Sequence, residues 1–276
     1  MSVICFVTYE IHPTTRGGCG VLLHHAARHL LERGHEVVFV IDAPPDAIAQ
    51  FRDVDRLDLP CADACHVVAV ADAQTDAALD RIDNLSLFHR QSLRFDRAVQ
   101  RAIARHSPDV IEFFEYCGPG YAHLVRRLFE RGGPSDGPVL ATRLHGPIEL
   151  IDRMSAVRNF DMQRHQLHAI ERAALHLAET ILTPTRQFFA AACAPVYDMP
   201  PEAAIESIPP KGAGFAPRDA ASAPDPESAR IVFLGRMFQF KGVDQLVHAG
   251  VELLRRRPSL DVTFELIGPD GHESPL

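Results

Sequence analysis

Two cations, Arg236 and Lys241, stand close together near the end of the chain. The apolar run Ile231–Leu234 precedes them, and a helical pattern begins after Gly242. This order is typical of a buried strand, a turn and the start of a helix. Fixed positive charges at the carboxyl end of a strand, beside a helix N-terminus, suit a diphosphate. The turn therefore predicts a diphosphate-binding site.

A glycine-rich turn near the start of the chain contains Gly17, Gly18 and Gly20. Glycine lets the backbone approach a ligand, and the helix expected after the turn offers free amides to an anion. We expect this turn to contact a ligand; a tight turn that needs glycine only for its geometry is the alternative. The dinucleotide pattern Gly-x-Gly-x-x-Gly lacks its third glycine here, but Asp42 stands where a ribose-binding acid would. An NAD(P)-dependent oxidoreductase therefore stays open as an alternative.

Two further candidates follow predicted strands. His145 follows the strand Val139–Leu144, and Glu115 follows the strand Val110–Phe114. Because ligands of open α/β sheets bind outside the carboxyl ends of the strands, His145 is placed to donate a hydrogen bond to a substrate or to titrate. Glu115 is placed to accept hydrogen bonds from a polyhydroxyl substrate. A structural histidine and an acid in a solvated loop are the respective alternatives.

Three clusters of reactive or basic side chains carry weaker signals. The Cys-x3-Cys spacing lacks a second pair, and the histidine pair lacks the intervening glutamate of zinc proteases, so we expect no metal. For the arginines a solvated helix face is the default, and contact with anionic lipid has no support at a net charge of −8. The clusters are Cys61, Cys65 and His66; His25 and His29; and Arg126, Arg127 and Arg131.

The composition is that of a globular protein rather than a nucleic-acid-binding or membrane-spanning one. The chain has 276 residues, 46% hydrophobic and 23% charged. It contains no dense block of Lys and Arg, so we expect no nucleic-acid partner. No apolar run approaches the length of a membrane span, and the N-terminus lacks a signal-peptide pattern. Several of the six cysteines lie in apolar runs, as free thiols do in a reducing compartment, so we expect a cytoplasmic protein.

The elements that must position these residues alternate between strands and helices. Most predicted strands are continuous apolar runs, which is typical of strands buried on both faces of a parallel sheet. The alternation predicts an α/β fold with a doubly wound sheet over residues 1–215. Residues 216–229 are rich in Pro, Ala, Ser and Asp and predict a linker. Residues 230–276 supply only one strand–helix–strand unit of a second domain.

Taken together, these motifs and their order resemble the retaining nucleotide-sugar glycosyltransferases of family 4, which have the GT-B fold. The resemblance covers nearly the whole chain, and the arginine–lysine turn is its most specific element. The segments that carry it are Gly17–Gly20, Leu30–Val37, His145–Gly146, Ala178–Thr185, Ile208–Gly212 and Gly235–Gly242.

The resemblance implies two Rossmann-like domains, an acceptor-side domain followed by a donor-binding domain. Arg236 and Lys241 would clamp the diphosphate of a nucleoside-diphosphate sugar and neutralise the leaving group. His145 would contact the sugar or acceptor near the reacting carbon, and the glycine turn would line the cleft. The acceptor would be a saccharide, a lipid or a small molecule. Such enzymes generally need no metal or other cofactor, because the two cations take the metal's role.

The chain also departs from the family's pattern. The family carries a pair of glutamates further along the donor-binding domain, and this sequence ends at Leu276 before that region. Pro209 and Pro210 stand in a segment where asparagine is commoner in the family. We therefore expect a truncated donor domain and little or no transferase activity from this chain. A non-catalytic acceptor-binding module stays open as a second alternative.

Overall fold

The fold was obtained as a computed structural model, which describes residues 1–15, 17–71, 85–130, 137–155, 161–207 and 228–268. The chain divides into two compact units. The N-terminal unit comprises residues 1–150 and 158–212, and the C-terminal unit comprises residues 151–157 and 213–276. Within the described residues, no helix is both long and apolar enough to cross a bilayer.

The described part of the N-terminal unit is built on a seven-stranded sheet in the order β3-β2-β1-β4-β5-β6-β7. Every strand pair in this sheet is parallel. The carboxyl ends of all its strands therefore lie along one edge. The strands are β1 (Val3–Thr8), β2 (Glu36–Ile41), β3 (Cys65–Ala69), β4 (Val110–Phe114), β5 (Val139–Arg143), β6 (Thr180–Thr183) and β7 (Ala204–Glu206).

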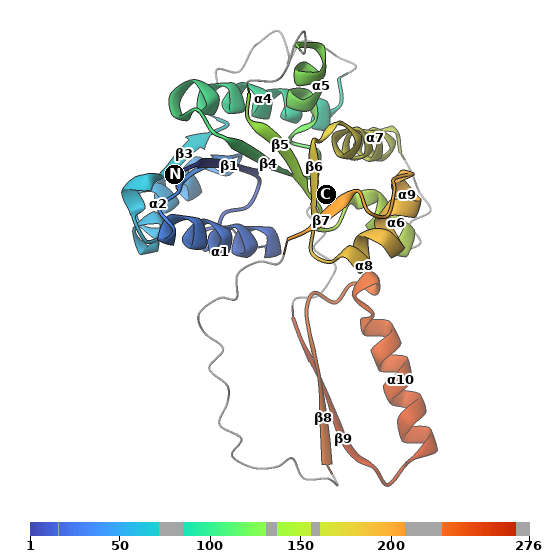
Figure 1. Cartoon of the computed structure of the whole chain (residues 1–276). Helices are drawn as coiled ribbons and strands as arrows, with labels where there is room; N and C mark the ends of the chain where they lie inside the picture. Colours follow the sequence, from blue (N-terminus) through green and yellow to red (C-terminus); the bar gives the residue numbers. More distant parts are fainter. Residues whose placement is uncertain (16, 72–84, 131–136, 156–160, 208–227, 269–276) are drawn as a thin grey trace. The chain divides into compact units, whose positions relative to one another are not determined.

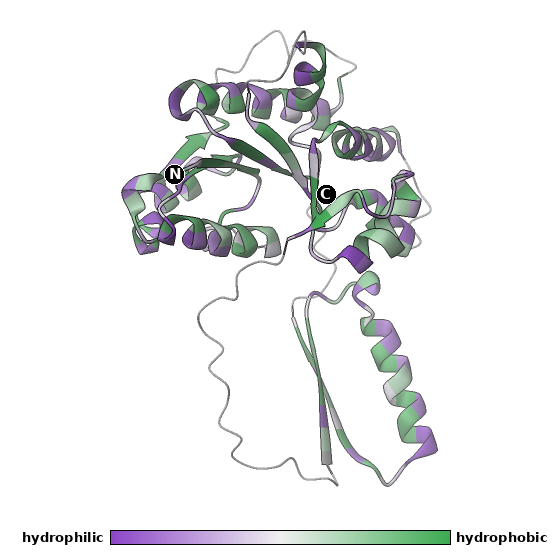
Figure 2. Ribbon diagram, viewed as in Figure 1, coloured by the Kyte–Doolittle hydropathy of each residue, from purple (hydrophilic) through white to green (hydrophobic). Residues whose placement is uncertain are grey.

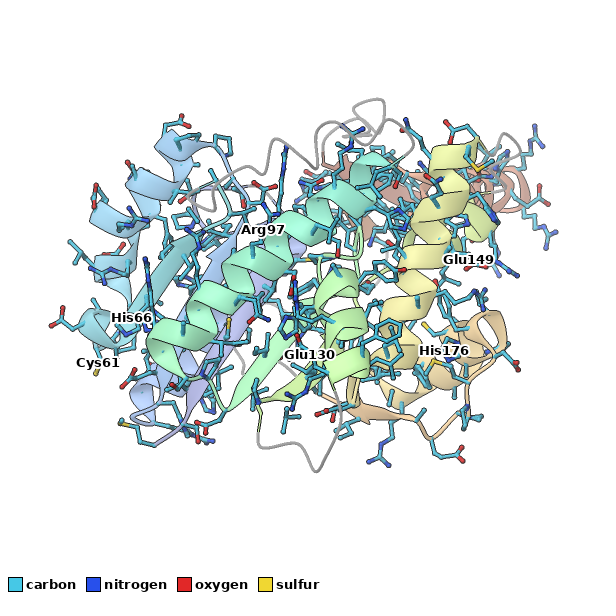
Figure 3. The ribbon with its side chains drawn as sticks, turned by 90° about the horizontal axis from the view of Figure 1, so that it is seen from above. Cys61, His66, Arg97, Glu130, Glu149 and His176 are labelled. Carbon is cyan, nitrogen blue, oxygen red and sulfur yellow. The ribbon has the colours of Figure 1, made fainter. Side chains whose placement is uncertain are left out.

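Helices cover both faces of this sheet. In Figure 1, α4 (Leu87–His106) and α5 (Tyr121–Glu130) lie above the sheet, and α1 (Gly18–Glu32) and α2 (Pro45–Asp53) lie below it. Seen from above in Figure 3, α4, α5 and α7 (Met162–Leu177) lie side by side over one face. This arrangement is doubly wound.

Alternating residues of one strand show how the sequence produces two apolar layers. Cys5 and Val7 of β1 pack with Phe95 and Val99 of α4. Phe6, which lies between them, belongs to the opposite cluster, which includes residues of α1 and α2. Successive side chains of a strand point to opposite faces, so a continuous apolar strand supplies both layers. Figure 2 shows the helices alternating between hydrophobic and hydrophilic residues, as amphipathic helices do.

A third apolar cluster supports the β6–β7 end of the sheet. Phe189 and Tyr197 are its largest buried side chains, and Ile181 of β6 packs with them. Its helical segments are α6 (Ile148–Met154), α8 (Arg186–Phe188), the π-helix η3 (Phe189–Cys193) and α9 (Ala194–Tyr197). Two 3-10 turns, η1 (Asp55–Asp58) and η2 (Ala62–Ala64), connect α2 to β3.

The described C-terminal unit contains a two-stranded parallel sheet and one long helix. Strands β8 (Ser228–Leu234) and β9 (Asp261–Ile267) pair in parallel, and α10 (Val243–Arg256) connects them after the short turn η4 (Gln239–Lys241). Gly250 is the buried residue of α10, and a Cβ there would lie 2.9 Å from the ring of Phe264. Glycine therefore lets α10 approach β9 closely.

The structure confirms the predicted fold class: a doubly wound parallel sheet followed by a strand–helix–strand unit. Strand β4 has the predicted bounds, β5 ends one residue earlier than predicted, and β8 begins at Ser228 rather than at Ile231. The helices α2 and α6 were not predicted. The linker was predicted over 216–229; its residues 216–227 lie outside the described residues, and Ser228 and Ala229 belong to β8. The segment Ile208–Gly212 also lies outside the described residues.

Candidate functional site

Two predicted site residues of the N-terminal unit, Glu115 and His145, and one residue that was not predicted, Glu10, follow strands that are neighbours in the sheet. Glu10 comes after β1, Glu115 after β4 and His145 after β5, and these strands are adjacent in the order β1-β4-β5. Because all carboxyl ends share one edge, residues far apart in the sequence are collected there. We call this the carboxyl edge of the sheet.

The glycine turn forms the start of α1 at this edge. The backbone N–H of Gly20 donates to Glu10 Oε2 over 3.0 Å, and a Cβ at Gly17 would overlap the Glu10 carboxylate. A Cβ at Gly18 would lie 3.4 Å from His145 Nε2. Two residues predicted separately, Gly18 and His145, are therefore neighbours. Glu10, which the sequence analysis did not select, lies at the positive end of the helix and complements its dipole.

The side chain of His145 is exposed at the carboxyl edge, and its backbone is hydrogen-bonded to the buried Glu115. Its ring lies 6.3 Å from that of Phe114, measured between centroids. The backbone N–H groups of His145 and Gly146 donate to Glu115 Oε1 over 2.7 and 2.5 Å. The side chain of His145 is thus exposed, and two hydrogen bonds to one carboxylate oxygen fix the backbone of the loop that carries it.

Glu115 is fully buried, so its interpretation as an acid in a solvated loop is wrong. The cause is the turn after β4, which directs the side chain under the His145 loop. Burial raises the pKa of Glu115 to about 7, although the backbone amides of Gly146 and His145 oppose this rise. Its second oxygen, Oε2, is buried without a hydrogen-bond partner. A hydrogen bond between Glu115 and a substrate stays a prediction.

A second buried carboxylate, Glu171 of α7, was missed by the sequence analysis. Its two oxygens accept hydrogen bonds from the backbone N–H groups of Cys117, at 3.0 Å, and Ile148, at 2.8 Å. Burial, and then the charge of Glu115, raise its pKa well above the usual range. A signal was present in the sequence, because Glu171 lies on the apolar stripe of its helix with Leu167, Ile170 and Ala174.

Asp42, the candidate ribose-binding acid, is engaged within the protein. It follows β2 and accepts a hydrogen bond from Gln91 Nε2 of α4 over 2.7 Å. This contact ties the end of β2 to α4 and occupies one carboxylate oxygen. Nothing in this arrangement replaces the missing third glycine of a dinucleotide turn.

The arginine–lysine turn of the C-terminal unit carries its two cations at the surface. Arg236 and Lys241 are both exposed, and Lys241 Nζ lies 5.2 Å from the centroid of the neighbouring Phe240 ring. Gly242 precedes α10 and has φ 79°. This left-handed backbone conformation favours glycine. The turn therefore presents two cations next to a helix N-terminus, as predicted from the sequence.

The weaker clusters behave differently from one another. Among the described residues, no group of three or more His, Cys, Asp or Glu side chains is arranged to hold a metal ion. All six cysteines are free thiols. Arg126 is exposed, as expected of a solvated helix face, and its guanidinium also pairs with Asp96, a buried residue of α4. Arg131 lies outside the described residues.

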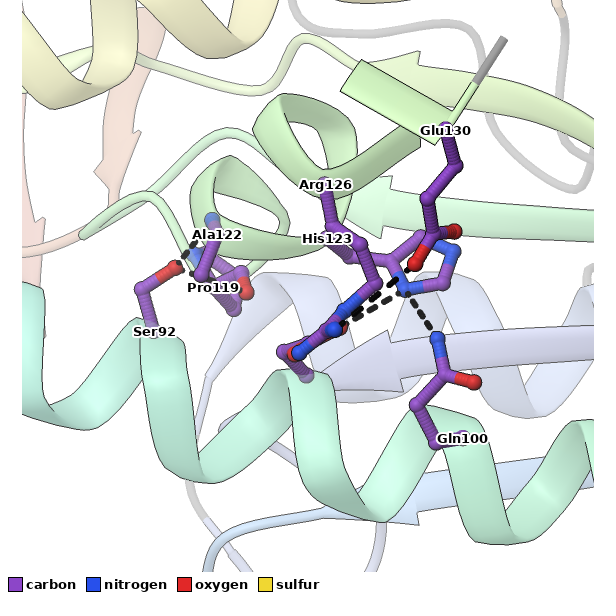
Figure 4. Close-up of polar contacts among 8 residues, drawn as sticks. Ser92, Gln100, Pro119, Ala122, His123, Arg126 and Glu130 are labelled. Carbon is purple, nitrogen blue, oxygen red and sulfur yellow. Dashed lines mark hydrogen bonds and ion pairs between the residues drawn. The ribbon is translucent and has the colours of Figure 1, made fainter. Parts of the chain in front are cut away.

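The contacts of Asp96 join α4 to α5, as Figure 4 shows for the surrounding residues. Asp96 Oδ1 lies 3.0 Å from His123 Nδ1 and accepts from Arg126 Nε over 3.1 Å. Burial acts to raise the pKa of Asp96, but the hydrogen bonds from His123 and Arg126 outweigh it and hold the pKa below its usual value. This network belongs to the packing of the two helices rather than to the carboxyl edge.

Comparison with known proteins identifies one family. A family model described as Glycosyltransferase Family 4 matches residues 16–210. This range contains the glycine turn and His145. No curated protein matches the sequence at a significant level.

Solved structures with a similar fold are distant in sequence. A UDP-glucosyltransferase from Polygonum tinctorium is 12% identical over 97% of this chain and 72% of its own, with a TM-score of 0.48. The glycosyltransferase SnogD from Streptomyces nogalater is 18% identical over 98% of this chain and 67% of its own, with a TM-score of 0.43. A UDP-N-acetylglucosamine 2-epimerase from Rickettsia bellii is 13% identical over 97% of this chain and 62% of its own, with a TM-score of 0.39. The chain spans 65% of the glycosyltransferase of kitacinnamycin, so it corresponds to only part of that protein.

Proposed function

The chain belongs to Glycosyltransferase Family 4, and on that premise we propose that it serves the transfer of a sugar from a nucleoside-diphosphate sugar to an acceptor, with retention of anomeric configuration. The observation that carries the proposal is the family match over residues 16–210, which includes both Gly18 and His145. The proximity of Gly18 and His145 at the carboxyl edge supports the proposal, because catalysis requires the groups that contact the substrates to lie close together.

In this proposal the C-terminal unit binds the donor. Arg236 and Lys241 hold the diphosphate and neutralise the charge that develops on the leaving group. Both side chains are exposed next to the start of α10, where backbone amides also favour an anion. Two fixed cations supply the charge that a divalent metal supplies in other transferases, so we propose that binding needs no metal.

The N-terminal unit binds the acceptor in the same proposal. Gly17, Gly18 and Gly20 line the site, and His145 contacts the acceptor or the sugar near the reacting carbon. Glu115 contributes by holding the backbone of His145 from beneath. The acceptor is a hydroxyl compound, whether a saccharide, a lipid headgroup or a smaller molecule.

Calorimetric titration with UDP and dTDP in the presence of EDTA tests the donor side. We expect binding without metal, and we expect Arg236→Ala and Lys241→Ala each to weaken it about tenfold, since each charge-assisted contact contributes roughly 1.5 kcal/mol. Arg256→Ala is the matched control, because this exposed arginine lies in the last turn of α10 and pairs with Glu252. Equal affinities in all four proteins would refute the diphosphate assignment.

Transfer is tested separately with UDP-glucose and dTDP-glucose against a panel of saccharide, lipid and small hydroxyl acceptors. A new glycoside with the donor's anomeric configuration, determined by proton NMR, supports retention. Acceptor binding without transfer or donor hydrolysis would favour the non-catalytic module instead. Tight binding of NAD(P) with no affinity for nucleoside diphosphates would restore the oxidoreductase alternative.

A further inference from the structure

Two glutamates from different elements are fully buried under the carboxyl edge: Glu115 after β4 and Glu171 on α7. Burial of a carboxyl group is costly unless hydrogen bonds compensate for the lost solvation. In a protein with an ordinary core, two such groups close to one another therefore need an explanation. Neither residue has a role in the donor-binding turn, which lies in the other unit.

The hydrogen bonds of the two carboxylates converge on one loop. Glu115 Oε1 accepts from the backbone of His145 at 2.7 Å and of Gly146 at 2.5 Å. Glu171 Oε2 accepts from the backbone of Ile148 at 2.8 Å, two residues further along. The segment from His145 to Ile148 is thus held at both ends by buried acceptors. Hydrogen bonds from backbone N–H groups to carboxylates are among the stronger hydrogen bonds in proteins.

Glu171 also secures the neighbouring turn after β4. Its Oε1 accepts from the backbone N–H of Cys117 at 3.0 Å. Cys117 has φ 59°, a left-handed conformation that is uncommon for a residue with a side chain. The next residue, Gly118, also has φ 59° and lies so close to Ile170 of α7 that a Cβ would overlap it. The turn that carries Glu115 is therefore held in a strained shape by α7.

The surroundings of the pair favour at least one proton on it at neutral pH. Burial raises the pKa of Glu115 to about 7 and that of Glu171 well above its usual range. Other titratable groups interact electrostatically with the pair, namely the thiols of Cys117 and Cys193 and the phenols of Tyr9, Tyr116 and Tyr197. Burial raises the pKa of both thiols to about 12 and holds the pKa of the three phenols above its usual value, so all five groups stay neutral.

We propose that Glu115 and Glu171 are positioning residues that fix the loop carrying His145, and that loss of a proton from this buried pair loosens the loop. When the pair loses that proton, two negative charges share one buried site, and the loop must loosen or admit water. The imidazole of His145, next to Gly18, would then move. The inference deepens the proposed function, because His145 is the residue proposed to meet the acceptor.

NMR of the whole chain tests this inference without any nucleotide sugar, so its failure and that of the proposed transferase activity are distinguishable. The probes are the backbone amides of His145 and Gly146 and the imidazole of His145, the latter assigned with His145→Asn. In the wild type we expect both amides to titrate together between about pH 6 and 8, the range set by the raised carboxyl. In Glu115→Gln the amides should keep their chemical shifts, because the amide oxygen still accepts, but lose that titration.

Two further variants complete the test: Glu115→Ala removes the acceptor of the His145 amide, and Glu171→Gln replaces the second buried carboxylate. We expect Glu115→Ala to change the chemical shifts of the His145 imidazole, because the ring loses its fixed backbone. Glu206→Gln is the matched control, since Glu206 also ends a strand of the sheet but is exposed. Amides that do not titrate in the wild type, or that titrate unchanged in Glu115→Gln, would overturn the inference. That comparison holds even if Glu115→Ala fails to fold.

Discussion

The two units use charged side chains in opposite ways. In the N-terminal unit, Asp96, Glu115 and Glu171 are buried and bonded to groups far away in the sequence. In the C-terminal unit, Arg236 and Lys241 are exposed on a turn of a few residues. Buried charges are expensive and stay only when bonded, whereas exposed charges are hydrated and ready for a ligand. The first kind gives its surroundings a fixed shape, and the second is the kind that we propose to bind an anion.

Ion pairs illustrate the same contrast. Arg143 and Glu112 form a buried bidentate pair within the N-terminal sheet, with N···O distances of 2.5 and 3.0 Å. Arg256 and Glu252 form an exposed pair one helical turn apart on α10. Breaking a buried pair leaves an uncompensated charge in the interior, whereas breaking an exposed pair returns two charges to water. Variants of each kind can therefore test the comparison directly.

The largest expected effect is that of Glu171→Ala. The variant leaves the amides of Cys117 and Ile148 without acceptors and removes a buried side chain, so we expect the free energy of unfolding to fall by about 3–5 kcal/mol. Urea unfolding followed by tyrosine fluorescence measures this in the N-terminal unit. All four tyrosines lie there, and the chain has no tryptophan.

Glu252→Ala is the control for Glu171→Ala. It removes an exposed carboxylate from α10 of the C-terminal unit, and we expect the free energy of unfolding of that unit to change by less than about 0.5 kcal/mol, as measured by amide exchange in α10. A cost for Glu171→Ala as small as this would mean that buried carboxylates do not shape the N-terminal unit, and the comparison would fail.

Asp96→Ala is expected to cost slightly less, about 3–4 kcal/mol, because Arg126 is partly exposed and can turn to water. The variant should also change how steeply stability decreases as the pH falls into the acid range. Because the pKa of Asp96 is depressed in the folded state, its contribution is present above the unfolded pKa and is lost as the pH falls through the folded pKa. Thermal melts between about pH 2 and 5 should therefore show a shallower acid limb in the variant than in the wild type. Parallel limbs would contradict the pairing.

The fold was predictable because its strands are marked locally. β1 is a continuous apolar run up to Thr8, β4 is interrupted only by Glu112, and the predicted bounds of β4 agree with the structure. The helix α2 was missed because it is short and only Ile48 and Phe51 face the core. The apolar pattern of the sequence predicts a helix over Leu93–Arg105, whereas α4 begins six residues earlier, at Leu87, after its N-cap Ser86.

The site was predictable where one rule of topology sufficed. His145 and the glycine turn meet because parallel strands end at the same edge, and this follows from the order of strands alone. Glu171 was not found because its partners lie 54 and 23 residues away, and hydrogen bonds at such separations leave no local pattern. Its polar character on an apolar helix stripe was the available signal, and the same applies to Asp96 on α4.

The next effect in size is the pH dependence that Glu115 imposes on stability. Its pKa is raised to about 7 in the folded state, so the unfolded chain loses its proton first. Stability is therefore full below the unfolded pKa and falls as the pH rises toward the folded pKa, by a total on the order of 3 kcal/mol. Glu115→Gln should remove this slope between about pH 5 and 7, as measured by urea unfolding at several pH values. An unchanged slope would mean that another group accounts for it.

The smallest effects come from two glycines with the same backbone conformation, one in each unit. Gly34 and Gly242 both have φ 79°, and a Cβ meets nothing within 4 Å at Gly34 and only Gln245 Oε1, at 3.6 Å, at Gly242. The substitution to Ala should therefore cost about 1 kcal/mol at either site, through the backbone alone.

Gly34→Ala should lower the midpoint of the tyrosine-detected transition. Gly242→Ala should leave that midpoint unchanged and accelerate amide exchange in α10, because its strain lies in the unit without tyrosines. If Gly242→Ala moved the tyrosine transition as far as Gly34→Ala does, the two units would unfold together, and differences in stability between buried and exposed charges could no longer be assigned to one unit or the other.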